Sequence, residues 1–215
     1  MQDVFDLFEH IRARASSEND RLAAAFRLAS GDARISALNI IHQQATISAE
    51  LLGHYMGWMP APAHTPADVE RAQLESAQRV ISLSKAAFIL SISAVEFSAK
   101  HAVADHPHCL TVPQGRVYLR GIIQESARAG VISRHMEHGW SGILELRNML
   151  VHNNAIAERT QAFELPDGPT LALAEGRMMH GNLRLLPEVL LWTTNAFAAW
   201  SGAFLGRVVN SSDDR

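Results

Sequence analysis

The chain has 215 residues, of which 47% are hydrophobic, and its formal net charge is -3. This length predicts one domain or two small ones, and the hydrophobic content supplies a core and argues against disorder. The charge excludes a global basic field, so a nucleic acid would have to bind at a local patch or in a groove made by assembly.

Compartment and membrane contact are indicated by three further features. Cys109 is the single cysteine, which fits a reducing compartment. Residues 1–11 carry three carboxylates and lack the basic and apolar regions of a signal peptide. The uncharged stretch 189–206 approaches the length of a membrane span, but its hydroxyl and amide side chains favour a buried core helix. We therefore expect a cytoplasmic protein with no membrane contact.

The N-terminal part has a helical period in its apolar residues. Val4, Phe8 and Ile11 predict a first short helix, and Leu22 and Phe26 belong to a second. A long helix capped by Asp32 follows and ends near Gly57. We interpret residues 1–60 as a helical extension packed on the core.

Residues 61–210 form the main predicted domain. The run Thr65-Pro66-Ala67-Asp68 predicts a helix start, because it combines a cap, a proline at the first helical position and an acidic residue three positions after the cap. This helix should extend to about Ala104 and lie centrally in the core, since its second half is apolar on nearly every side.

The remaining elements are shorter, apart from the last helix. A helix over 114–128 is expected, and a segment from Ser133 follows with Gly139 as a candidate break. Alternating residues on both sides of Pro166-Asp167-Gly168 predict a short β-hairpin. A last helix should run from residue 186 to about 209, with residues 211–215 as a disordered tail. The fold class is therefore all-α, a helical bundle with a long central helix and a short β-hairpin.

The run Arg147-Asn148-Met149-Leu150-Val151-His152-Asn153 places polar groups at the end of an apolar helical segment. Histidine moves protons near neutral pH, and arginine holds phosphate. Asn148 and His152 are four apart and share a face with Glu145, so Asn148 can orient the imidazole. Arg147 lies about 140° from His152 around the helix, on a mostly apolar line, and needs a partner.

This run resembles the R-x4-H motif of the HEPN superfamily in its "LRNxxVHN" form, on residues 146–153. The resemblance covers roughly residues 76–208. HEPN domains often carry an acidic residue on an earlier core helix, and Glu96 stands where one is expected. The resemblance thus implies Arg147, Asn148 and His152 as catalytic residues, with Glu96, Asn153 and Glu145 in support.

The family implies a metal-independent endoribonuclease, in which the RNA 2'-OH attacks the adjacent phosphate. His152 would act as general base or acid and Arg147 would stabilise the transition-state charge. The resemblance further implies RNA as substrate, a homodimer with a composite active site, and a toxin or phage-defence role with an antitoxin or defence-system partner.

Two alternatives remain open at this level. In the first alternative, the chain is a non-catalytic helical module for dimerisation or RNA binding, and Arg147 forms a structural ion pair with Glu96. In the second alternative, a metal site uses the segment 101–109, with potential ligands at His101, His106, His108 and Cys109. Their spacing matches no standard zinc site, so a polar loop is favoured, and we expect neither metal nor cofactor.

Overall fold

The computed structural model describes residues 1–57, 65–112, 117–152, 156–177 and 183–213. It is an all-α bundle with one short hairpin in the described ranges, as the sequence predicts. The elements in chain order are α1 (Gln2–Phe26), α2 (Ala33–Gly57), α3 (Pro66–Asp105), α4 (Leu119–Arg128), α5 (Arg134–His152), β1 (Gln161–Glu164), β2 (Thr170–Leu173) and α6 (Leu185–Asp213).

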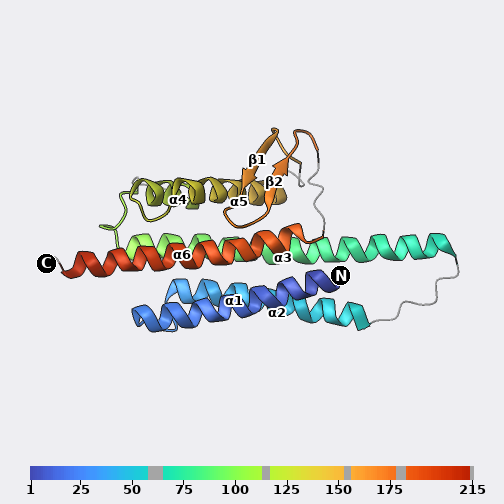
Figure 1. Ribbon diagram of the computed structural model, residues 1–215, viewed down its shortest axis with the longest axis horizontal. Helices are drawn as coiled ribbons and strands as arrows, with labels where there is room; N and C mark the ends of the chain where they lie inside the picture. The colour runs from blue at the N-terminus through green and yellow to red at the C-terminus, as the bar shows by residue number, and fades with distance from the viewer. Residues whose placement is uncertain (58–64, 113–116, 153–155, 178–182, 214–215) are drawn as a thin grey trace.

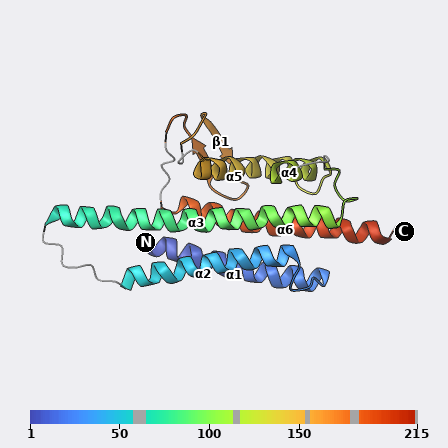
Figure 2. The same cartoon turned by 180° about the vertical axis from the view of Figure 1, so that it is seen from behind.

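The elements form three layers (Figure 1). The hairpin of helices α1 and α2 makes the first layer, α3 and α6 lie side by side in the middle, and α4, α5 and the β-hairpin cover the opposite side (Figure 2). One continuous hydrophobic core connects all three layers. The N-terminal extension therefore shares its core with the rest of the chain.

Helix α1 is continuous, so the prediction of two short helices over this segment is wrong. Ala15 and Glu18 are buried and continue the helical spacing of the core face between Ile11 and Leu22. Because Glu18 is acidic, the sequence pattern does not indicate that it lies on the core face of a continuous helix. Its carboxylate is paired within α1, at 2.8 Å from Arg14 and at 2.6 Å from a second arginine, Arg21.

Helix α3 begins at the predicted capping box. The Thr65 hydroxyl accepts a hydrogen bond from the backbone N–H of Asp68, and the Asp68 carboxylate accepts one from the Thr65 backbone. By length and composition α3 could cross a membrane, and 44% of its most apolar window is buried. In this bundle it packs on both α2 and α6.

Helix α6 contains the uncharged stretch 189–206, and its predicted burial is confirmed. Val189, Leu190, Phe197 and Trp200 are all at most 1% exposed. The helix continues to Asp213, three residues into the segment predicted as a disordered tail.

Two predictions for the third layer need correction. Helix α4 starts at Leu119 rather than near residue 114, although residues 113–116 lie outside the described ranges. Gly139 does not break α5. A Cβ on it would stand 2.8 Å from Cζ2 of Trp192, so Gly139 gives α6 room to approach α5.

The β-hairpin pairs β1 with β2 in antiparallel register, with Phe163 opposite Leu171. It is joined to α6 by the indole N–H of Trp192, which donates to the carbonyl oxygen of Pro166 at 2.8 Å. The hairpin is thereby held against the middle layer, and Gly139 and Gly142 of α5 lie against its residues Pro166 and Phe163.

Candidate functional site

A pocket of about 1180 Å³ lies where α3, the start of α4 and the end of α5 meet. The catalytic residues predicted from the motif all line it, together with both described supporting carboxylates: Arg147, Asn148, His152, Glu96 and Glu145. The structure thus brings into one site five residues that come from two helices separated in the sequence.

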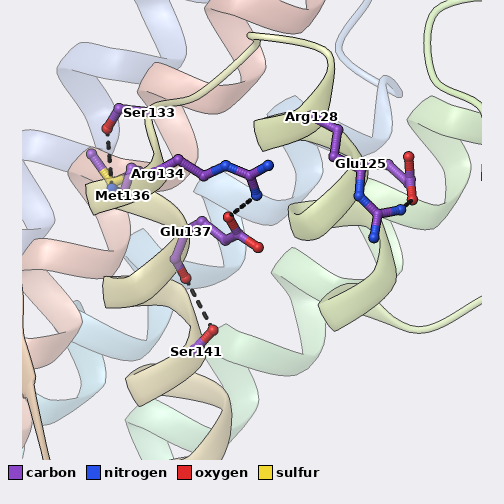
Figure 3. A network of polar contacts seen from close by, with 7 residues as sticks. All are labelled: Glu125, Arg128, Ser133, Arg134, Met136, Glu137 and Ser141. Carbon is purple, nitrogen blue, oxygen red and sulfur yellow. Dashed lines mark hydrogen bonds and ion pairs between the residues drawn. The ribbon is translucent and has the colours of Figure 1, made fainter.

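The position of α5 is fixed first at its start, where polar contacts order the turn after α4 (Figure 3). The Ser133 hydroxyl caps the helix by accepting from the Met136 backbone N–H at 3.1 Å. Arg134 pairs with Glu137 at 2.7 Å, and the Ser141 hydroxyl donates to the Glu137 carbonyl oxygen.

The middle of α5 is fixed by a close approach to the β-hairpin. A Cβ on Gly142 would stand 2.6 Å from the Cβ of Phe163, a separation that real side chains do not tolerate. Glycine is therefore required here for packing. Because the motif begins one turn later, this contact sets the direction in which Arg147 and His152 project.

Arg147 is partly buried and has an amide as its partner. Its Nη1 donates to Oδ1 of the neighbouring Asn148 at 3.2 Å. Its Nε is buried without a hydrogen-bond partner in the described chain, which is a costly state for a guanidinium group. The arrangement leaves donors of Arg147 for an anionic ligand in the pocket.

The alternative ion pair of Glu96 with Arg147 is not formed within the described ranges. The Glu96 carboxylate pairs instead with Lys100, one turn further along α3, at 2.7 Å. The i, i+4 spacing of these two residues is the reason, since it places both on one helix face. The same spacing was visible in the sequence and could have predicted the pair.

Glu145 has a partner on a different helix. Its carboxylate lies 3.5 Å from Nη2 of Arg120 in the first turn of α4. The pair links α4 to α5 across the pocket. Arg120 was missed by the sequence analysis, because nothing in the local pattern of either helix indicates that these two residues meet.

His152 is exposed at the last position of α5 and lines the pocket beside Asn148. The Oδ1 atom of Asn148 accepts a hydrogen bond from Arg147. This hydrogen bond does not orient the His152 imidazole, as the sequence had predicted for Asn148. Asn153, the remaining supporting residue, lies outside the described residues.

The charge of the pocket lining is close to balanced. It includes four cations and three carboxylates, and so has one formal positive charge with histidine neutral: Lys100, Arg120, Arg147, Arg159, Glu96, Glu145 and Glu158. Two of the cations pair with carboxylates of the same pocket but stay 39% and 44% exposed at the side chain. They can therefore still contact a ligand.

The segment 101–109 does not assemble as a metal site. His101 lies against the ring of Phe97, and His106 and His108 meet edge to face with ring centroids 6.2 Å apart. Cys109 is buried. Across the described ranges, no three His, Cys, Asp or Glu residues are grouped so that they could hold a metal ion.

The arrangement combines a proton-transfer group and an anion-binding group in one open site. An imidazole and a guanidinium that line one pocket are suited to acid–base chemistry on a phosphate ester. Comparison with models of known families, with curated proteins and with solved structures finds no match.

Proposed function

We propose that this chain is a metal-independent endoribonuclease of the HEPN type. The observation that carries the proposal is that Arg147, Asn148 and His152 line one pocket while Arg147 is paired with no carboxylate in the described chain. An arginine held for stability alone would be expected to meet an acidic partner. Here Arg147 donates to an amide and lines the pocket.

In the proposed reaction the 2'-oxygen of a ribose forms a bond to the adjacent phosphorus, and the bond from phosphorus to the 5'-oxygen breaks. The proton of the 2'-OH passes to a base, and a second proton reaches the leaving 5'-oxygen. The products are a 2',3'-cyclic phosphate and a 5'-OH. His152 performs one of the proton transfers, and Arg147 stabilises the charge on the phosphate.

A second histidine would come from a second copy of the chain. This homodimer with a composite site is part of the proposal, and exposed apolar residues on α3 support it. Leu90 is 49% and Phe97 is 59% exposed, seven residues apart on one helix face and close in sequence to Glu96 of the pocket. The proposal also includes a role as a toxin or in phage defence in the cytoplasm, with an antitoxin or another defence-system protein as partner.

The test is cleavage of a mixed RNA substrate by the purified protein in EDTA, with the product ends determined. We expect 2',3'-cyclic phosphate ends from the wild type. His152→Ala should lower the rate by about 100- to 10,000-fold, the usual contribution of a general acid or base. The matched control is His135→Ala, which changes an exposed histidine at the other end of α5 and should leave the rate unchanged. Equal rates for wild type and His152→Ala would refute the proposal.

A second candidate is a non-catalytic module that binds RNA or dimerises. It is favoured by the pairing of Lys100 and Arg120 with carboxylates, which lowers the positive charge available to a phosphate. Under this candidate the protein binds RNA or forms dimers, and no cleavage appears in EDTA or in Mg²⁺.

A further inference from the structure

The side of the pocket formed by the start of α4 carries an exposed aromatic ring. Tyr118 precedes α4 in extended backbone conformation, lines the pocket and is 52% exposed. The residue is thus open to a ligand in the pocket, and a tyrosine side chain offers both an apolar ring face and a polar hydroxyl.

One cation lies over this ring, and a second lines the same pocket. The Lys100 ammonium lies 5.8 Å from the ring centroid of Tyr118, within the range of a cation–π contact. Arg120 follows two residues later and also lines the pocket, with 44% of its side chain exposed. An aromatic face among basic groups is the combination that proteins use for single-stranded nucleic acid, with the base on the ring and the backbone near the cations.

The remaining wall near Tyr118 adds a group that can contact a base edge. Gln124 lies one turn after Arg120 on α4, is exposed, and lines the pocket. Its amide both donates and accepts hydrogen bonds.

We propose that Tyr118 is the stacking platform for one unpaired base of the RNA bound at the Arg147–His152 site. The inference rests on the proposed function for the position of the phosphate. A base inside a duplex is already stacked on both faces, so only an unpaired base can lie on the ring. Tyr118 is a binding residue here and takes no part in proton transfer.

The experiment measures binding separately from cleavage. The probe is a short, unstructured, fluorescently labelled RNA with 2'-O-methyl riboses, which cannot be cleaved by 2'-OH attack. Its affinity for the full-length protein is measured by anisotropy in EDTA, alone and annealed to its complement. We expect Tyr118→Leu to weaken single-strand binding by about 5- to 150-fold, the effect of losing one stacked base. Tyr118→Phe should stay within about twofold, since it retains the ring.

The chain offers a matched control in its other tyrosine. Tyr55 on α2 also lies beneath a cation, with the Arg79 guanidinium carbon 5.9 Å from its ring centroid, but it does not line the pocket. Tyr55→Leu should leave RNA affinity unchanged. Unchanged affinity in Tyr118→Leu, equal wild-type affinity for duplex and single strand, or no RNA binding by the wild type would each overturn the inference.

A second measurement locates the stacked base on the RNA with the wild-type protein and then compares it with Tyr118→Leu. A series of probes carries a single abasic site at successive positions. At one position the wild type should lose as much affinity as Tyr118→Leu loses with the intact probe, and the combination should lose no more. Equal losses at all positions would contradict a single stacking site. Cleavage without a Tyr118 effect would refute this inference alone, whereas a Tyr118 effect without cleavage would refute the catalytic proposal alone.

Discussion

The Glu96 carboxylate lies 2.7 Å from the Lys100 ammonium, one turn further along α3, and the pair forms one wall of the pocket that contains the motif. This contact separates the two interpretations of Arg147. A structural role required Glu96 as its partner, and Glu96 is committed to another cation. Within the part of the chain that the structure describes, Arg147 is hydrogen-bonded to Asn148 and lines the pocket.

Replacement of Arg147 should therefore affect activity more than stability. We expect Arg147→Ala to lower RNA cleavage by about 100- to 1000-fold, as for the loss of one transition-state hydrogen-bond donor. The melting temperature should fall by no more than about 4 °C, since only packing of the side-chain stem is lost. Arg147→Lys should recover little activity, because an ammonium group lacks the planar fork of donors.

The control for Arg147 is Arg134→Ala in the first turn of the same helix, where the arginine pairs with Glu137 outside the pocket. It should cleave RNA at the wild-type rate. If Arg147→Ala instead loses the roughly 3–5 kcal/mol of unfolding free energy typical of a broken buried ion pair, the structural interpretation is correct.

The Glu96–Lys100 pair predicts that a substitution removing a charge from the pocket strengthens RNA binding. Glu96→Gln keeps the shape of the side chain and removes the charge that neutralises Lys100. We expect tighter binding of the uncleavable single-stranded RNA. The slope of log affinity against log salt should become steeper by about 0.7, the value for one more phosphate contact on a single strand.

Glu75→Gln is the matched control, because Glu75 also pairs with a cation one turn later on α3, Arg79 at 3.8 Å, but outside the pocket. Both substitutions should change the unfolding free energy by less than about 1 kcal/mol, since the pairs are partly exposed. Identical salt dependence in Glu96→Gln and the wild type would show that Lys100 does not contact the RNA.

Local sequence signals predicted much of this fold because their causes are local. The capping box of Thr65 and Asp68 and the turn at Pro166-Asp167-Gly168 require only neighbouring residues, and both are found as predicted. The motif helix was recognised for the same reason. Glu18 shows the limit, since an acidic residue on the core face of α1 concealed a continuous helix until its arginine partners were known.

The pocket itself was only half predictable. Arg147, Asn148 and His152 stand in one run of sequence, but Arg120 and Tyr118 reach the site through the packing of α4 against α5. Periodicity assigns a residue to a face of its own helix and does not say which other helix covers that face.

The close approach of α5 to the hairpin predicts that one added methyl group lowers the stability of the protein. Gly142→Ala would place a Cβ 2.6 Å from the Cβ of Phe163. We expect a loss of about 1–3 kcal/mol in unfolding free energy from overpacking, and a melting temperature lower by several degrees. The shift of α5 should also reduce RNA cleavage, because the motif lies one turn further along the same helix.

Gly206→Ala is the control for this substitution. Gly206 is also within a helix, α6, and a Cβ there would meet nothing within 4 Å. The substitution should stabilise the protein by about 0.5–1 kcal/mol, the gain of alanine over glycine in a helix. Thermal melting of the two variants side by side checks the sign of both effects.

A polar cluster at the start of α2 and the end of α3 predicts a pH dependence of stability. The buried Arg34 pairs with Asp32 at 2.5 Å at the start of α2, close to His106 at the end of α3. Burial lowers the pKa of His106 below its ordinary 6.5, and the Arg34 charge lowers it further. Burial alone would raise the pKa of Asp32, but the hydrogen bonds and charge of Arg34 outweigh it and hold that pKa below 3.8.

The sign follows from proton binding. Because the pKa of His106 is lower in the folded state, the unfolded chain binds more protons between the folded pKa and 6.5, and stability falls as the pH decreases through that window. The Asp32 contribution persists there and is lost only at more acidic pH, as its lowered pKa is approached. We expect the melting temperature of His106→Gln to decline less than that of the wild type between about pH 7 and pH 5. A His10→Gln control on the exposed face of α1 should retain the wild-type decline, and a parallel decline in all three proteins would contradict the role of His106.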